Sequence, residues 1–104
     1  MKVLITGGAG YIGSHLTDYF HTNGDTVTVV DNLSTGDIKN IQHNIQSSRY
    51  TFVHGSILDR ALMEKLIEGH DLICHLAAVV YFHLLTGIAG DKFRHRDSPL
   101  CYII

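Results

Sequence analysis

Residues 3–16 read Val-Leu-Ile-Thr-Gly-Gly-Ala-Gly-Tyr-Ile-Gly-Ser-His-Leu, and this stretch decides the fold. An apolar run opens it, three glycines follow at G-x-x-G-x-x-G spacing, and a helical pattern closes it. Gly7 allows the backbone angles of a sharp turn, Gly10 leaves room for a ligand group against the main chain, and Gly13 lets the helix pack tightly. A helix that begins near Gly10 or Tyr11 aims its first N–H groups at an anion, so the stretch predicts a phosphate-binding turn.

An acidic residue stands at the distance from this turn that a dinucleotide site requires. Asp31 lies 18 residues after Gly13, directly after the apolar run 27–30. Its carboxylate can accept hydrogen bonds from both ribose hydroxyls of an adenosine, at about 1.5–3 kcal/mol for a charged hydrogen bond. Because the same carboxylate would repel a 2′-phosphate, NAD is favoured over NADP. The alternative is a mere tight turn followed by a solvated acidic strand end, and the joint pattern favours the dinucleotide site.

Composition limits the chain to one soluble domain. It has 104 residues, 45% of them hydrophobic, which suits an α/β domain, and its formal net charge of −2 carries no nucleic-acid signature. The basic cluster at 92–96 is short and is better explained as a solvated stretch. The two cysteines, Cys74 and Cys101, form no C-x-x-C pair, which indicates a reduced, cytoplasmic compartment.

The stretch 72–90 contains no Asp, Glu, Lys or Arg and is the candidate for a membrane span. It contains His75, His83 and Thr86, and its first part has the pattern of a buried strand, so we expect no membrane segment. We also expect no signal peptide, because only Lys2 precedes the short apolar strand.

Strand and helix patterns alternate along the chain. The expected strands are 2–6, 26–31, 50–54 and 71–76, and the expected helices are 11–23, 37–48 and 59–69. Gly24 is expected to end the first helix in a left-handed cap, and Asp59 to cap the last one. The apolar face expected on helix 11–23 consists of Ile12, Leu16, Tyr19 and Phe20, and that on 37–48 consists of Ile38, Ile41 and Ile45.

This order predicts an α/β fold: a Rossmann-type parallel sheet with helices on both faces, strand order 3-2-1-4, truncated, with right-handed connections. Its ligand crevice lies between the first and fourth strands. Ala77 and Ala78 end the fourth strand, and their small side chains leave room for a cofactor to cross, although ordinary strand–helix packing also explains them. After Val80 the pattern is lost, and the sequence leaves open whether 100–104 adds a strand or dangles.

Other chemistry finds little support in the sequence. None of the eight histidines has a metal-ligand spacing to Cys, Asp or Glu, so we interpret them as structural or surface residues. The Walker phosphate loop, the G-x-S-x-G motif and the H-E-x-x-H motif do not occur, which argues against the enzyme classes that they define.

Four motifs in order resemble one family. They are TGGAGYIGSHL, VVDNLSTG, HGSILDR and HLAA, and together they are similar to the extended short-chain dehydrogenases/reductases. More narrowly, they resemble the NAD-dependent sugar-nucleotide epimerases and dehydratases, of the UDP-glucose 4-epimerase or UDP-glucuronate decarboxylase type. The resemblance implies an NAD-binding Rossmann half-domain over 1–80, a divergent tail over 81–104, and a UDP-sugar as substrate only in a full-length relative.

The resemblance also implies roles for individual residues. Those that would hold the pyrophosphate are Gly7, Gly10, Tyr11, Ile12 and Gly13. The adenine-side ribose and its loop would involve Asp31, Asn32, Ser34, Thr35 and Gly36. The adenine would lie between Ser56 and Ile57, and the path toward the nicotinamide ribose would be lined by Leu76, Ala77 and Ala78. Family members commonly carry Asp at the Ser56 position, where it accepts from the adenine amino group; serine is shorter and neutral.

The catalytic Tyr-x-x-x-Lys pair of this family does not occur in the 104 residues. Four residues after Tyr11, Tyr19, Tyr50 and Tyr81 stand His15, Asn23, His54 and Leu85. We therefore expect the chain to be catalytically incomplete as given. Two alternatives stay open: a non-catalytic NAD-binding module that self-associates through an exposed fourth strand, and a truncated, non-functional remnant.

Overall fold

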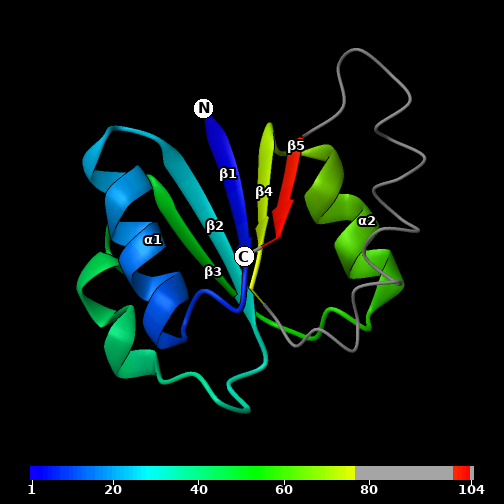
Figure 1. Cartoon of the computed structure of the whole chain (residues 1–104), viewed down its shortest axis with the longest axis horizontal. Helices are drawn as coiled ribbons and strands as arrows, with labels where there is room; N and C mark the ends of the chain where they lie inside the picture. The colour runs from blue at the N-terminus through cyan, green and yellow to red at the C-terminus, as the bar shows by residue number, and fades with distance from the viewer. Residues whose placement is uncertain (77–99, 104) are drawn as a thin grey trace.

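The computed structural model describes residues 1–76 and 100–103, which form a five-stranded sheet with helices on both faces (Figure 1). The strand order is β3-β2-β1-β4-β5, and every neighbouring pair is parallel. The strands are β1 (Lys2–Thr6), β2 (Thr26–Asp31), β3 (Tyr50–His54), β4 (Leu72–His75) and β5 (Leu100–Ile103). The helices are α1 (Tyr11–Thr22), α2 (Arg60–Glu68) and the short 3-10 helices η1 (Ile38–Asn40) and η2 (Gln42–Asn44). The predicted Rossmann-type order 3-2-1-4 is confirmed.

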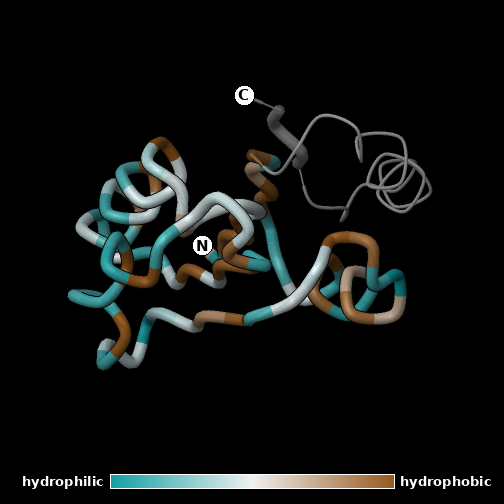
Figure 2. The backbone as a smooth tube through the Cα atoms, turned by 90° about the horizontal axis from the view of Figure 1, so that it is seen from below, coloured by the Kyte–Doolittle hydropathy of each residue, from teal (hydrophilic) through white to brown (hydrophobic). Residues whose placement is uncertain are grey.

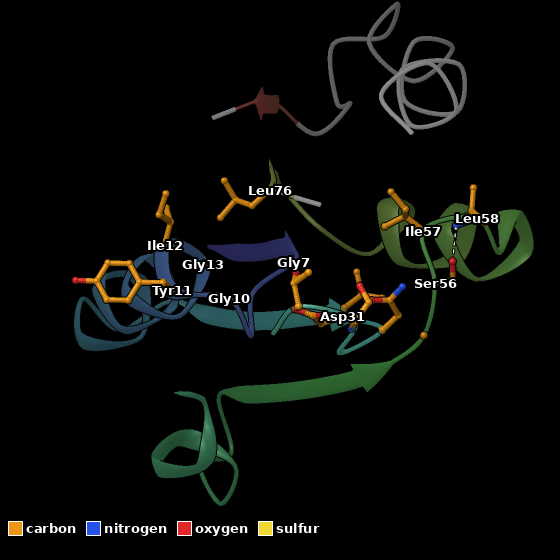
Figure 3. A pocket seen from close by; sticks show the side chains of 15 residues that line it. Gly7, Gly10, Tyr11, Ile12, Gly13, Asp31, Ser56, Ile57, Leu58 and Leu76 are labelled. Atoms are coloured by element: carbon orange, nitrogen blue, oxygen red, sulfur yellow. Dashed lines mark hydrogen bonds between the residues drawn. The ribbon is translucent and has the colours of Figure 1, made fainter. Parts of the chain in front are cut away.

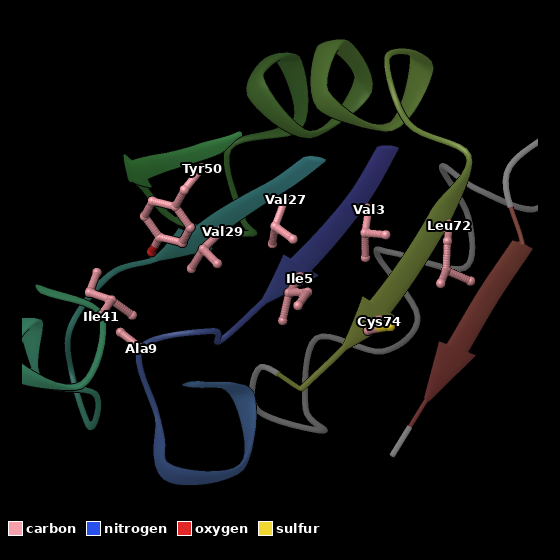
Figure 4. Close-up of a cluster of buried hydrophobic side chains, with 9 residues drawn as sticks. All are labelled: Val3, Ile5, Ala9, Val27, Val29, Ile41, Tyr50, Leu72 and Cys74. Carbon is pink, nitrogen blue, oxygen red and sulfur yellow. The ribbon is translucent and has the colours of Figure 1, made fainter. Parts of the chain in front are cut away.

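Strand β1 is the centre of the sheet, with Val3 in register with Val27 of β2 on one side and Leu72 of β4 on the other. Because side chains alternate along a strand, β1 supplies both faces of the core. Val3 and Ile5 point toward α1 and the 3-10 helices (Figure 4). That cluster consists of Val3, Ile5, Ala9, Val27, Val29, Ile41, Tyr50, Leu72 and Cys74.

The opposite face of the sheet is covered by α2. Leu4 belongs to this second cluster together with Met63 and Ile67 of the helix, all fully buried. Asp59 caps α2 as predicted, because its carboxylate accepts from the Leu62 N–H at 3.1 Å. In Figure 2 the tube of α2 alternates between hydrophobic and hydrophilic residues, as expected for a helix that covers a sheet on one side only.

The buried face of α1 differs from the prediction. Gly13, Ser14 and Thr17 are buried, whereas Ile12 and Tyr19 are 61% and 62% exposed. Leu16 and Phe20 pack partly against the core, so only these two members of the expected apolar face are correct. The reason is close approach: small residues let the helix lie against the turn before it. At its other end the prediction is confirmed, since Gly24 has the left-handed φ of 91°.

The predicted helix over 37–48 is wrong. The structure has η1 and η2 there, separated by Ile41, whose φ of −117° departs from helical values. The side chain of Asp37 accepts from the Lys39 N–H, and Asn44 donates to the Asp18 carboxylate of α1 at 2.7 Å. Such residues favour caps and turns over helix interiors. Ile41 is buried, while the flanking Ile38 and Ile45 are 42% and 45% exposed.

The fourth strand is not the edge of the sheet. Leu72 to His75 of β4 pair in parallel with Leu100 to Ile103 of β5, which answers the question that the sequence left open for this segment. The expectation of an exposed β4 is therefore wrong, because β5 takes up its outer backbone groups. Self-association itself stays a prediction. Among the described helices, none has the length and apolar character needed to cross a membrane. Ala77, Ala78 and most of the stretch 72–90 lie outside the described residues.

Candidate functional site

A cavity of about 420 Å³ lies where β1, β2, β3 and β4 reach their carboxyl ends (Figure 3). This is the position at which open parallel sheets bind ligands. Four segments that are distant in sequence meet there: the turn after β1, the end of β2 with its loop, the segment after β3, and Leu76 after β4. The predicted site residues that line it are Gly7, Gly10, Tyr11, Ile12, Gly13, Asp31, Asn32, Ser34, Thr35, Ser56, Ile57 and Leu76.

The turn after β1 has the backbone that the sequence predicts. Gly7 has a φ of 71°, in the left-handed region, and its N–H donates to the Val30 carbonyl of β2 at 2.8 Å. A Cβ on Gly13 would lie 2.4 Å from the Gly7 oxygen, so a side chain there would push the helix off the turn. The structural reasons given for Gly7 and Gly13 are thus confirmed, while their contact with a diphosphate stays a prediction.

The amino end of α1 opens toward the cavity. Its first intrahelical bond runs from the Ser14 N–H to the Gly10 carbonyl at 2.9 Å, so the N–H groups of residues 11–13 precede the hydrogen-bonded ladder. The first turn contains no acidic residue, and none of the described residues that line the cavity is basic. An anion would therefore be held by main-chain N–H groups and the helix dipole, whose charge interaction is about 0.3–1 kcal/mol at an exposed end.

Asp31 is buried rather than solvated, with 8% of its surface exposed. Its Oδ2 accepts from the Ala9 N–H at 2.9 Å, and its Oδ1 accepts from the Leu33 N–H at 2.7 Å. The second contact supports Leu33 in a left-handed conformation with a φ of 62°. A carboxylate offers about four acceptor positions, so about two remain for ligand hydroxyls. The solvated strand end that the sequence allowed as an alternative is thereby wrong.

The loop after β2 forms a polar wall of the cavity. Asn32 shapes it, because its side-chain oxygen accepts from the Ser34 N–H at 3.0 Å. Gly36 differs from its predicted lining role, since it lies behind the wall. A Cβ on Gly36 would stand 2.9 Å from Asp31 Oδ2. Gly36 therefore permits the position of the carboxylate instead of facing the ligand.

The segment after β3 forms the apolar end of the cavity. Ile57 is nearly buried, Leu58 is 53% exposed, and the hydroxyl of Ser56 accepts from the Leu58 N–H at 3.0 Å. The cavity-lining residues that sequence reasoning missed are Val30, Gly55 and Leu58. Each is a direct sequence neighbour of a predicted residue. The predicted positions of the strand ends could therefore have indicated that these residues line the cavity.

His75 is buried at the end of β4 and is hydrogen-bonded to the cavity wall through Thr6. Its Nδ1 shares a 2.6 Å hydrogen bond with the Thr6 hydroxyl, and that hydroxyl accepts from the Leu76 N–H at 3.1 Å. Burial lowers the pKa of His75, so the neutral ring is favoured. Within residues 1–76, no group of three or more His, Cys, Asp or Glu side chains is placed to hold a metal ion.

Comparison with known proteins places these features in a family. The model of the NAD dependent epimerase/dehydratase family matches residues 3–90. UDP-N-acetyl-alpha-D-glucosaminuronate decarboxylase of Bacillus cytotoxicus is 42% identical over 79 residues, which are 76% of this chain and 24% of that protein. UDP-glucuronic acid decarboxylase 2 of Arabidopsis thaliana is 39% identical over 77 residues, which are 74% of this chain and 16% of that protein.

Solved structures of such enzymes have the same fold. The UDP-glucose 4-epimerase of Thermotoga maritima, crystallised with UDP-glucose, is 36% identical and superposes with a TM-score of 0.64 over 90% of this chain and 28% of its own. The Bordetella bronchiseptica enzyme WbmH, crystallised with NAD+, is 40% identical with a TM-score of 0.68, over 74% of this chain and 25% of its own. The chain spans at most about a quarter of the length of the curated relatives quoted above.

Proposed function

The chain belongs to the NAD dependent epimerase/dehydratase family, and we propose that it is the NAD-binding N-terminal part of an enzyme that acts on a nucleotide sugar. The observation that carries this proposal is the cavity, which joins the glycine turn, Asp31 and residues 55–58 at one edge of the sheet. These are the parts needed for a diphosphate, a ribose and a base, and the described residues supply them from three separate segments.

The residues fit the cofactor in chemistry as well as in position. The amino end of α1 would bind the diphosphate through main-chain N–H groups, and Asp31 would accept from the adenine-side ribose through its remaining lone pairs. Ile57 and Leu58 would pack against the faces of the base, with Ser56 at its edge. When bound, NAD supplies a hydride acceptor. Asp31 and the main-chain N–H groups at the amino end of α1 would orient it.

The sign of the charge at Asp31 supports NAD over NADP. The carboxylate is buried and its two oxygens already accept main-chain N–H groups, so it is fixed in place and a 2′-phosphate would have to approach it directly. Isothermal titration of the purified chain with NAD and with NADP tests this. We expect measurable binding of NAD and at least about tenfold weaker binding of NADP, a difference of about 1.4 kcal/mol. Tighter binding of NADP would refute the assignment of Asp31.

We propose further that these 104 residues bind the cofactor without turning over a sugar nucleotide by themselves. The support is the sequence, which places no Lys four residues after any Tyr. Incubation of the chain with NAD and UDP-glucose, followed by chromatography of the sugar nucleotides, should show no product. Conversion of UDP-glucose would contradict this part of the proposal only. A cytoplasmic location, as the cysteine pattern indicates, belongs to the same proposal.

A non-functional remnant is distinguished from a binding part by its melting behaviour. We expect a cooperative thermal transition whose midpoint rises with NAD concentration, because a ligand that binds only the folded state stabilises it by mass action. A broad transition that NAD leaves unchanged would favour the remnant.

A further inference from the structure

The carboxylate of Asp31 contacts the phosphate-binding turn directly, although the residues are 22 positions apart. Asp31 Oδ2 accepts from the main-chain N–H of Ala9, in the middle of the turn, at 2.9 Å. Ala9 is fully buried, and so is this hydrogen bond. The carboxylate at the ribose end of the cavity is therefore part of the structure that shapes its diphosphate end.

The segment that follows Asp31 binds the main-chain carbonyl of Ala9 as well. The Ala9 carbonyl accepts from the Asp37 N–H at 3.1 Å and from the Asn40 side-chain amide at 2.8 Å. Both polar groups of one turn residue are thus bound by the segment 31–40. Space is also tight at this point, because a Cβ on Gly36 would lie 2.9 Å from both Asp31 Oδ2 and the carbonyl carbon of Ala9.

The charge of Asp31 is balanced by main-chain N–H groups. The ion pairs within the described part of the chain join Met1 to Asp25 and Arg60 to Glu64, His43 forms a 2.7 Å hydrogen bond with Asp18, and none of these contacts involves Asp31. The negative charge is instead held by the N–H groups of Ala9 and Leu33. Hydrogen bonds to a charged group are stronger than neutral ones, and a buried N–H that loses its acceptor is costly. The position of Ala9 therefore depends on the carboxylate.

We infer that Asp31 is a positioning residue for the diphosphate turn in addition to its proposed contact with the ribose. The inference rests on the proposed function and deepens it, because it makes the two ends of the nucleotide site one unit. Removal of the Asp31 carboxylate should weaken binding of a nucleoside diphosphate even when the ligand has no ribose hydroxyls. A carboxylate that served the ribose alone would not have that effect.

The test compares ADP with 2′,3′-dideoxyadenosine 5′-diphosphate, which keeps the diphosphate and lacks both hydroxyls. Asp31→Asn removes the charge and leaves an amide donor opposite one of the two N–H groups. Gly36→Ala crowds the contact between the carboxylate and Ala9 from both sides without changing a residue that lines the cavity. Asp37→Asn is the matched control, because Asp37 also accepts a main-chain N–H two residues on but its side chain does not hold Ala9. Calorimetry measures each affinity.

We expect Asp31→Asn and Gly36→Ala each to weaken binding of the dideoxy ligand by about tenfold or more. This is the equivalent of one lost hydrogen bond to a charged group. Asp37→Asn should stay within about twofold of the unchanged chain. A folded Asp31→Asn that loses affinity for ADP but keeps its affinity for the dideoxy ligand overturns the inference. If Asp31→Asn does not fold, unchanged dideoxy affinity in Gly36→Ala overturns it.

A second readout needs no ligand. In the ¹⁵N-labelled chain the Ala9 amide should exchange slowly and resonate downfield, as a buried N–H bound to a carboxylate does. Gly36→Ala should speed its exchange about tenfold or more, and Asp37→Asn should leave it unchanged. Unchanged exchange in Gly36→Ala overturns the positioning role. Failure of the unsubstituted chain to bind NAD, ADP and the dideoxy ligand overturns the proposed function instead, so the two failures are distinguishable.

Discussion

The hydroxyl of Thr6 and the Nδ1 atom of His75 lie 2.6 Å apart where β1 and β4 end side by side. His75 is 2% exposed, and its Nε2 has no hydrogen-bond partner within the part of the chain that the structure describes. The Thr6 hydroxyl also accepts from the Leu76 N–H, which begins the wall of the cavity beyond β4. A buried neutral imidazole thus joins two central strands next to the candidate site.

The first prediction concerns acid stability. Burial lowers the pKa of His75 below its ordinary value of 6.5, so below that pH the unfolded chain binds a proton that the folded chain refuses. The contribution of His75 to the free energy of unfolding is complete above pH 6.5 and is lost as the pH falls below it. The free energy of unfolding changes through this group by at most about 1.4 kcal/mol per pH unit. Urea unfolding from pH 8 to pH 5 measures this. In His75→Gln the free energy of unfolding should differ less between pH 8 and pH 5 than in the unchanged chain. An unchanged difference would contradict the prediction.

A second prediction concerns Tyr50, whose side chain is buried below the 3-10 helices. Its hydroxyl has no partner among the described residues, and burial, followed by the charges of Asp18 and Asp31, raises its pKa well above the ordinary 10.0. Above pH 10 the unfolded chain loses a proton that the folded chain keeps, so stability falls there. Tyr50→Phe should remove this loss and be neutral or slightly stabilising at pH 7, because it deletes an unsatisfied buried group. Strong destabilisation at pH 7 would show that the hydroxyl is bonded.

A third prediction tests the close approach of α1 to the turn. Gly13→Ala places a Cβ 2.4 Å from the main-chain oxygen of Gly7, which cannot move aside like a flexible side chain. We expect a loss of about 1–3 kcal/mol in the free energy of unfolding, as for other overpacked sites. Gly69→Ala is the matched control, because its nearest neighbouring atom would be 3.8 Å away, and its φ of −84° suits alanine. Equal effects of the two substitutions in urea unfolding would rule out the steric explanation.

A fourth prediction addresses the base end of the cavity. A carboxylate at position 56 would be a charged acceptor for the adenine amino group of a bound NAD, whereas a hydrogen bond from that amino group to the Ser56 hydroxyl would be neutral. Hydrogen bonds to charged groups exceed neutral ones by about 1 kcal/mol, so Ser56→Asp should bind NAD about fivefold more tightly. Nicotinamide hypoxanthine dinucleotide has an oxygen in place of that amino group. Its affinity should therefore not increase in Ser56→Asp. Equal gains for both ligands would place the effect outside the base.

The sequence by itself determined the first four strands, the helices α1 and α2, and the turn between β1 and α1. These features depend on local chemistry, because G-x-x-G-x-x-G spacing after an apolar run has few structural solutions, and Asp31 follows a strand of β-branched residues. The resemblance of four ordered motifs then indicated the family. Twelve of the fifteen predicted site residues line one cavity, because parallel strands deliver their carboxyl ends to the same edge.

Only the tertiary structure decided which side chains those elements bury and what they contact. Periodicity on α1 favoured Ile12 and Tyr19, but the close approach to Gly7 puts Gly13 and Thr17 inside instead. The segment after β2 became two 3-10 helices because its polar side chains found partners on α1 and on the turn. The contact between Asp31 and Ala9 joins residues 22 positions apart, and its existence depends on the space that Gly36 leaves. Hydrophobic pattern is a property of each segment, whereas these contacts depend on how segments distant in sequence approach one another.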